Sequence, residues 1–330
     1  MWSTLKTVRR HLGWAITTAM LLGMAWGWFL PAKGMKPLIL PLTVVMILPM
    51  MVGLNGRALL GRCTWRLLAG TQLINFVAMP AVGFGLGRLF FPDQPMVALG
   101  LLLMALIPTS GMTVSWTGFA KGNLAAATKM TVVGLLLGAV LTPLYTQALM
   151  GQAVDVPLLK MFSQIGLVIA APLILGQAAR VILLRRFGQQ AFARRIKPRM
   201  PLLSTIGLLG IVFVAMALKA RSILTDPMSI LALLPAILLF YVASFGLSTL
   251  LARATLERAD AVAMVYSVGV RNLSVALALV MTAFGEAGAS GALIIAVALI
   301  VQVQVAAAYL KLAPKLLGTA DGETAIQPAA

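Results

Sequence analysis

The sequence predicts an all-α integral membrane protein that crosses the bilayer ten times. Hydrophobic residues occupy 61% of its 330 positions and charged residues only 10%, against about 45–50% and about 25% in a soluble domain. Long apolar runs follow one another along the chain, and most basic residues fall in alternate connections between them. A soluble enzyme of this length needs far more polar surface, so that class is excluded.

Each apolar run is about as long as a membrane-spanning helix, which takes about 20 residues. The first run follows a basic segment, and we expect a retained helix instead of a cleaved signal because no clear cleavage motif ends it. Strands of a membrane barrel would alternate over about 10 residues instead. The predicted spans are Leu12–Leu30, Pro37–Leu54, Leu67–Phe91, Met96–Trp116, Leu124–Leu149, Pro157–Leu184, Met200–Leu218, Ile230–Leu251, Ala261–Phe284 and Ala289–Leu310.

Charge sets the predicted orientation of these helices. The chain carries 26 basic and 8 acidic residues, a net charge of +18, which is also typical of nucleic-acid-binding proteins. The basic residues gather, however, before the first span, after the even-numbered spans and near the C-terminus. The positive-inside rule places that side in the cytoplasm. We therefore predict a multi-pass protein of the cell membrane, with both termini cytoplasmic and no nucleic-acid partner.

An internal duplication is predicted to divide the chain into two halves. The third, fourth and fifth spans recur as the eighth, ninth and tenth at nearly constant spacing, as for Leu67 and Ile230. Because five spans per half is an odd number, the second half would insert upside down, an arrangement typical of secondary transporters. We predict a first five-helix repeat at 1–155, a second, inverted repeat at 156–317 and a disordered polar tail at 318–330.

Two spans in matching positions of the halves are interrupted near mid-membrane. In the fourth span, Pro108 removes a backbone donor, and Thr109, Ser110 and Gly111 follow at once. Lipid cannot satisfy the backbone groups that such a break frees, so these groups must face protein or a cavity. The ninth span carries polar or flexible residues at the same depth, namely Ser267, Gly269, Arg271, Asn272 and Ser274.

Arg271 is the most informative of these residues, because an arginine at a helix centre costs about 2.5–3.5 kcal/mol by insertion measures. Two interpretations stand: a structural arginine that bonds freed carbonyls of the fourth span, or an anion-binding or charge-compensating group of a transport site. Asn75 in the third span and Thr131 in the fifth are polar candidates for the same cavity. Lys129 is expected to snorkel toward the cytoplasmic end of the fifth span, and Gln302 to pack between helices.

No sequence pattern points to an enzyme active site. The eight acidic residues fall in loops, at span ends or in the tail, so no carboxylate lies at mid-membrane to bind a cation or relay a proton. We find no nucleophile–base pair, metal-ligand set or phosphate-binding motif. The prediction is therefore a protein without enzymatic activity, cofactor or metal site.

The interrupted spans resemble the crossing helices of the bile acid:sodium symporter superfamily, which includes the arsenite-efflux permeases. The stretch IPTSGMTVSWTGFAKGN is similar to the arsenite-permease pattern in Pro108, Met112 and Trp116. The stretch SVGVRNLSVALAL is similar to a glycine-glutamine-asparagine stretch of the symporters in Gly269 and Asn272. The resemblance implies a six-helix core of spans three to five and eight to ten, and a four-helix panel of spans one, two, six and seven.

Several positions depart from the pattern of these relatives. By resemblance, Ser267 corresponds to a sodium-binding glutamate of the symporters and Arg271 to a sodium-binding glutamine. Asn75 corresponds to a third-span glutamine that helps to bind sodium. A fifth-span serine corresponds to Ala127, and the cysteine that arsenite permeases require corresponds to Thr109. These departures weaken the case for sodium coupling and for thiolate coordination of trivalent arsenic.

We therefore predict a secondary transporter that moves a small organic anion or oxyanion by alternating access. Arsenite or antimonite efflux is the first alternative, and a transport-inactive sensor or scaffold is the second. Predicted partners are a small anionic or polar solute, anionic membrane lipid at the long basic loop between spans six and seven, and a sodium ion or a proton as candidate coupling ion. The residues predicted to bind solute or ion are Arg271, Asn272, Ser267, Thr109, Ser110, Thr113, Asn75, Thr131 and Lys129.

Overall fold

The computed structural model describes residues 12–53, 63–225 and 228–318, and every regular element within these ranges is a helix. The predicted all-α class is confirmed. Except for Gly318, the predicted tail at 318–330 lies outside the described residues, as do the basic segment before the first span and the loop at 54–62.

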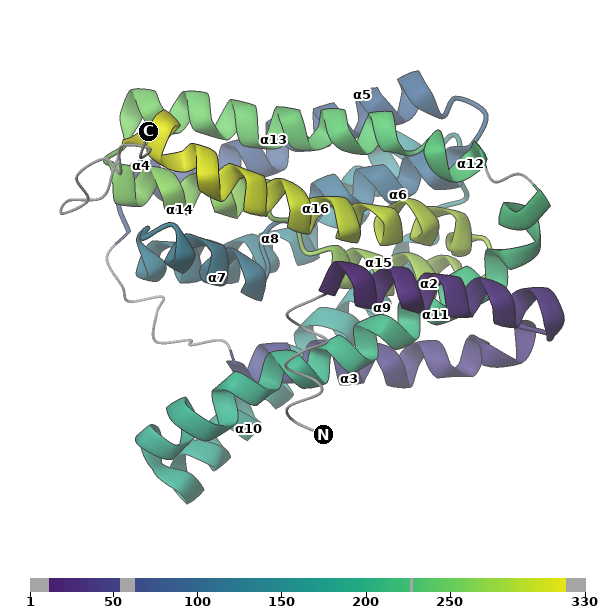
Figure 1. Cartoon of the computed structure of the whole chain (residues 1–330), viewed down its shortest axis with the longest axis horizontal. Helices are drawn as coiled ribbons and strands as arrows, with labels where there is room; N and C mark the ends of the chain where they lie inside the picture. Colours follow the sequence, from purple (N-terminus) through teal and green to yellow (C-terminus); the bar gives the residue numbers. More distant parts are fainter. Residues whose placement is uncertain (1–11, 54–62, 226–227, 319–330) are drawn as a thin grey trace, which may run out of the picture.

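Most helices run along one common direction, and α10 diverges from the others at one end (Figure 1). The first part of the chain forms α2 (Leu12–Phe29), η1 (Lys33–Leu38), α3 (Ile39–Gly53), α4 (Trp65–Leu73), η3 (Ile74–Ala78), α5 (Met79–Phe90), α6 (Pro95–Leu106), α7 (Gly111–Phe119) and α8 (Leu124–Met150). The remainder forms α9 (Leu158–Ile165), η4 (Gly166–Ala170), α10 (Ala171–Ala191), η5 (Phe192–Ile196), η6 (Lys197–Arg199), α11 (Met200–Thr225), α12 (Met228–Leu231), α13 (Leu234–Thr255), α14 (Arg258–Gly269), α15 (Leu273–Phe284) and α16 (Gly288–Leu317).

The helices have the length and surface of membrane-spanning elements. Six helical stretches of the described chain are long and apolar enough to cross a membrane, and three shorter apolar helices accompany them. Large apolar side chains such as Trp14, Ile174 and Val242 are exposed on the outside of the molecule. Water does not favour such a surface, whereas lipid does, so the chain is a membrane protein.

The helices pack as two groups. In the first group, α11 packs against α2 and α3, and α3 also packs against α10. Glycines allow this close approach: a Cβ on Gly27 of α2 would overlap the carbonyl of Ala217 on α11. The second group contains α4 to α8 and α13 to α16, with α6 packed against both α5 and α16. Contacts between the groups are made chiefly by α15 and α16, which pack against α2, α3 and α11.

Several helices extend beyond the predicted apolar runs. α11 continues to Thr225, and α16 passes through Pro314 to Leu317. α10 reaches Ala191, with a non-helical residue at Gly188 (φ 76°). The sequence pattern locates the apolar stretch that lipid covers, whereas lysine and arginine extend a helix into the headgroup region at little cost. The end of an apolar run therefore does not mark the end of its helix.

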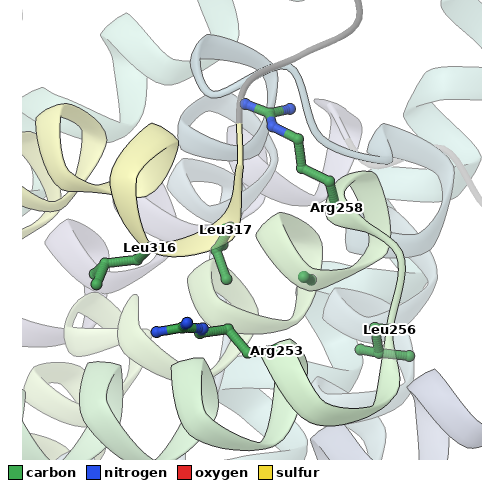
Figure 2. Close-up of a pocket in the computed structure, with 6 residues that line it drawn as sticks. Arg253, Leu256, Arg258, Leu316 and Leu317 are labelled. Carbon is green, nitrogen blue, oxygen red and sulfur yellow. The ribbon is translucent and has the colours of Figure 1, made fainter.

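A small pocket lies at one end of the second group (Figure 2). It is bordered by the end of α13, the start of α14 and the end of α16, and its volume is about 240 Å³.

Candidate binding site at the helix crossing

The two predicted interruptions lie against each other inside the second group of helices. The predicted fourth span is broken between Leu106, where α6 ends, and Gly111, where α7 begins. The ninth is broken between Gly269 and Leu273, the end of α14 and the start of α15. Two hydrogen bonds join the breaks. The Asn272 N–H donates to the Ile107 carbonyl at 3.0 Å, and the Thr113 hydroxyl donates to the Val270 carbonyl at 3.3 Å.

The first break owes its shape to Pro108 and to a cap on α7. The Ser110 Oγ accepts from the Met112 N–H at 3.2 Å, while the Ser110 N–H donates to the Thr113 hydroxyl at 3.0 Å. This reciprocal pair satisfies donors that the start of a helix leaves free. Thr109, fully buried between Pro108 and the cap, has a φ of 53°. A β-branched residue rarely adopts this left-handed conformation, so the break holds local strain.

Asn272 caps α15 at the second break. Its Oδ1 accepts from the Val275 N–H at 3.3 Å, the interaction expected of an N-cap asparagine. Its Nδ2 has no hydrogen-bond partner among the described residues, although the side chain is only 1% exposed. A buried amide donor without a partner is uncommon, and it makes this position a candidate for contact with a bound solute.

Arg271 lies at the centre of the crossing and is 1% exposed. Its Nη1 donates to the Asn75 Oδ1 and its Nη2 to the Ala105 carbonyl, both at 2.6 Å. The guanidinium carbon lies 5.8 Å from the centre of the Phe240 ring, a cation–π contact. The Ala105 carbonyl is one of those freed by the break, because the residue four positions later is Thr109, which is not helical. The structure thus contains the contact expected of a structural arginine, a hydrogen bond to a carbonyl that the broken helix leaves free.

Gln302 completes the environment of Arg271. Its Oε1 accepts from the Arg271 N–H at 2.8 Å and from the Tyr241 hydroxyl at 3.0 Å, and its Nε2 donates to the Arg271 carbonyl at 3.2 Å. Both backbone groups of Arg271 are therefore satisfied by one amide. We predicted Gln302 only as a helix-packing residue. In the structure this buried residue contacts Tyr241 of α13 and also holds the second break in place through both backbone groups of Arg271.

The position of Asn75 depends on a proline in the next turn. Pro80 has no N–H to donate to the Phe76 carbonyl, and the Tyr145 hydroxyl donates to this carbonyl instead, at 2.6 Å. The helix widens there into the π-helical turn η3, which contains Asn75, a common adjustment at functional positions. The Asn75 Nδ2 donates weakly to the Ser267 carbonyl at 3.5 Å. The Ser267 hydroxyl itself has no partner among the described residues.

The remaining predicted site residues contribute less directly. Thr131 offers its carbonyl to the Thr109 hydroxyl at 3.4 Å, while its own hydroxyl donates to the Ala127 carbonyl at 2.8 Å. Lys129, near the start of α8, is partly exposed, and its ammonium group forms no hydrogen bond within the described residues. The structure therefore brings Thr131 to the first break and leaves Lys129 outside the network.

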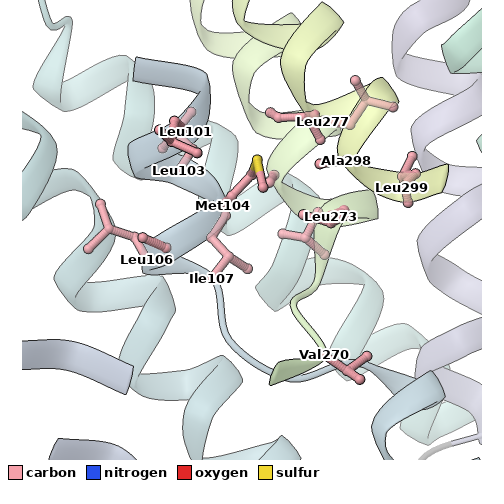
Figure 3. Close-up of a cluster of buried hydrophobic side chains, with 14 of the residues drawn as sticks. Leu101, Leu103, Met104, Leu106, Ile107, Val270, Leu273, Leu277, Ala298 and Leu299 are labelled. Atoms are coloured by element: carbon pink, nitrogen blue, oxygen red, sulfur yellow. The ribbon is translucent and has the colours of Figure 1, made fainter. Parts of the chain in front are cut away.

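Apolar side chains surround the crossing (Figure 3). Leu106 and Ile107 approach from the first break, Leu273 and Leu277 from α15, and Leu299 from α16, all of them buried. Electrostatic interactions are stronger in such a low-dielectric shell, and unpaired polar groups are more costly there. The hydrogen bonds of Arg271 reach only an amide oxygen and a backbone carbonyl, so no carboxylate neutralises its charge within the described chain.

Two interrupted helices that cross at a buried polar site inside an all-helical membrane protein form an arrangement typical of secondary transporters. The chain is a member of the sodium bile acid symporter family, which matches residues 40–226. The resemblance found in the sequence is thereby confirmed.

Three relatives agree with this assignment. An arsenical-resistance protein of Corynebacterium glutamicum is 24% identical over 235 residues, which cover 67% of this chain and 63% of that protein. A probable chloroplastic sodium/metabolite cotransporter of Oryza sativa is 29% identical over 164 residues, 49% of this chain and 38% of the relative. Sodium/bile acid cotransporter 7 of Danio rerio is 35% identical over 115 residues, 34% and 32% of the two chains. The chain thus spans less than two thirds of each relative.

Proposed function

We propose that this chain is a secondary transporter that carries a small organic anion or oxyanion by alternating access, with its solute site at the crossing. The observation that carries the proposal is that α7 and α15 both begin at the two joined breaks. The caps of these helices satisfy the Met112 and Val275 N–H groups, and the helix dipole still adds positive potential at each end. Two such ends at one site favour an anion.

The side chains near these helix ends support the same choice. The Asn272 Nδ2 and the Arg271 Nε–H are buried donors without partners among the described residues, and neither atom can accept a hydrogen bond. The Ser267 hydroxyl is also unpaired. A solute with several acceptor oxygens would satisfy such donors, whereas a metal cation would not.

We assign Arg271 the role of a built-in cation, not that of the main solute ligand. Its terminal nitrogens are engaged by Asn75 and Ala105, and one face of its guanidinium lies near Phe240. A fixed positive charge among these oxygens makes a bound sodium ion unnecessary and would repel one. We therefore propose that transport by this chain does not require sodium.

Uptake into liposomes containing the full chain tests this function. We expect at least one small carboxylate or oxyanion to be taken up saturably, at the same initial rate in sodium and in potassium buffer. Uptake that requires sodium would contradict the built-in cation. If no anion enters and arsenite does, the anion site is wrong and the metalloid alternative is correct.

The variant Asn272→Asp separates solute binding from folding in the same assay. An aspartate still accepts the Val275 N–H and caps α15, but it removes the Nδ2 donor and adds a negative charge. We expect the thermal midpoint to stay near that of the wild type while the KM for the anion rises by about tenfold or more. An unchanged KM would exclude Asn272 from the solute site.

Arsenite or antimonite efflux is the second candidate, favoured by the alignment with the arsenical-resistance protein. Against it stands Thr109, at the position that corresponds by resemblance to the cysteine of arsenite permeases. A hydroxyl is a poor ligand for a thiophilic element, and this hydroxyl already donates to the Thr131 carbonyl. The anion proposal therefore ranks first.

We further propose that the chain crosses the membrane ten times as two inverted repeats, at 1–155 and 156–317. The order of elements supports this: the interrupted pair α6 and α7 precedes the long α8, just as α14 and α15 precede the long α16. The group formed by α2, α3, α10 and α11 would be the panel, together with α9, and the group around the crossing would be the core.

The single cysteine, Cys63, can report the proposed cytoplasmic orientation. It lies in the connection before α4. Burial raises the pKa of its thiol, so labelling should be slow at neutral pH and faster at alkaline pH, where more thiolate is present. We expect a membrane-impermeant maleimide to label Cys63 in inside-out vesicles and not in right-side-out vesicles. The opposite result would place this connection, and with it both termini, outside the cytoplasm.

A further inference from the structure

The pocket at the end of the second helix group is separate from the crossing. Its volume of about 240 Å³ is below the range of about 300–1,000 Å³ typical of sites for drug-sized ligands, so it suits one small chemical group. Two basic and four apolar side chains line it, from the ends of α13 and α16 and the start of α14 (Figure 2). They are Arg253, Leu256, Arg258, Ala261, Leu316 and Leu317.

The two arginines of the pocket differ in what they already bind. Arg258 donates to three backbone carbonyls, those of Ala120 at 3.3 Å, Lys121 at 3.4 Å and Gly318 at 2.6 Å. Its guanidinium points away from Leu317 in Figure 2, whereas the guanidinium of Arg253 lies on the other side of that residue. Arg253 is exposed and donates no hydrogen bond within the described residues. The guanidinium N–H groups of Arg253 are therefore available to bind a ligand.

Among the residues that the structure describes, no acidic side chain lines the pocket beside Arg253. Glu257 and Asp260 are the nearest acids along the chain, and neither lines the pocket. The Asp260 carboxylate accepts from the Asn123 Nδ2 at 2.8 Å. The unneutralised charge of Arg253 therefore favours an anionic group, and a guanidinium suits a phosphate in particular because it can donate two parallel hydrogen bonds.

An apolar track leads from this charge along the outside of the molecule. Leu250, three residues before Arg253 on α13, is 69% exposed, and Leu312, four residues before Leu316 on α16, is 48% exposed. Residues at these spacings share one face of a helix. The track lies on the apolar outer surface that faces lipid, so a ligand with both a phosphate and a long apolar chain matches it.

We propose that this pocket binds the phosphate of an anionic phospholipid. Arg253 contacts the phosphate, Leu316 and Leu317 flank the glycerol part (Figure 2), and an acyl chain lies along Leu250 and Leu312. The site is independent of the solute proposed for the crossing, because none of its residues takes part in that network.

Lipid-dependent melting of the purified full chain in detergent tests the site. We expect phosphatidylglycerol to raise the thermal midpoint of the wild type and phosphatidylcholine to raise it far less. In Arg253→Gln, about tenfold more phosphatidylglycerol should be needed for the same rise, as expected when a charge-assisted hydrogen bond is lost. Because Arg253 is exposed, the midpoint without lipid should match that of the wild type.

Arg221→Gln is the matched control, since Arg221 is also exposed but lies on α11, away from the pocket. It should respond to phosphatidylglycerol like the wild type. Equal loss of response in both variants, or equal responses of the wild type to the two lipids, would overturn the proposal. If inorganic phosphate at equal concentration abolishes the lipid effect, the pocket binds a soluble phosphate and the lipid assignment is wrong.

Discussion

Replacing Arg271 by methionine is expected to abolish uptake and to lower the thermal midpoint of the protein. The variant leaves the Asn75 Oδ1 and the Ala105 carbonyl buried without a donor, at about 1–3 kcal/mol for each group. Removing a buried charge also recovers part of its desolvation cost, so the net loss is smaller than the sum. Thermal melting in detergent and uptake into liposomes measure the two effects. A variant that melts and transports like the wild type would contradict the role of Arg271.

A smaller substitution tests the charge itself. Arg271→Ser leaves a hole beside the oxygen atoms of Asn75 and Ala105, and the variant lacks the fixed positive charge. If the guanidinium stands in for a cation, sodium should raise the thermal midpoint of Arg271→Ser while potassium does not. The wild type should respond to neither ion. Absence of a sodium effect on the variant would mean that Arg271 serves only to bond the freed groups.

Gly100→Ala should destabilise the crossing from a distance. A Cβ at Gly100 of α6 would lie 2.5 Å from the Gly291 carbonyl and 2.6 Å from the Ile294 Cγ2 on α16. The two helices must then separate, and such overpacking costs about 1–3 kcal/mol. Because α6 carries the Ala105 carbonyl and α16 carries Gln302, we expect lower uptake as well as a lower thermal midpoint.

Gly85→Ala provides the matched control for this variant. Gly85 is also a helical glycine, on α5, and a Cβ there would meet nothing within 4 Å. Alanine favours a helix over glycine by up to about 1 kcal/mol, so this change should be neutral or slightly stabilising, with normal uptake. Equal behaviour of the two variants would show that the close approach of α6 and α16 does not matter.

The breaks could be predicted because their cause is local. Pro108 in an apolar run and Arg271 at mid-span are visible without knowledge of the fold. The structure joins the two breaks through the Asn272 N–H and the Ile107 carbonyl, and it bonds Arg271 to Asn75. Depth alone made Asn75 a candidate for the same cavity as Arg271, because polar groups at one level of a membrane avoid lipid by meeting. The hydrogen bond between the two side chains comes from the structure. The ten-helix plan rested on the lengths of apolar runs, which locate helices well and their ends poorly.

Other parts of the site could not be predicted from the sequence. Gln302 and Gln304 look alike in the sequence VQVQV, and only the rotation of α16 buries Gln302 and directs it toward Arg271. The second acceptor for Arg271 is the carbonyl of Ala105, a residue whose side chain carries no signal at all. The π-helical turn at Asn75 has a visible cause in Pro80, which lacks the N–H that would bond the carbonyl of Phe76, four residues earlier. A proline inside an apolar run is therefore a signal worth searching for in other spans.

The contacts of Arg271 also bear on the order in which the chain enters the membrane. Its partners Asn75 and Ala105 precede it by 196 and 166 residues, and Gln302 follows it by 31. During synthesis the fourth span therefore arrives with free carbonyls long before the arginine that binds them. Lipid cannot satisfy those groups, so we expect α6 to stay near water or the insertion machinery until α14, α15 and α16 are made. Assembly of the crossing is thus a late step of biogenesis, completed only when the final helix is in place.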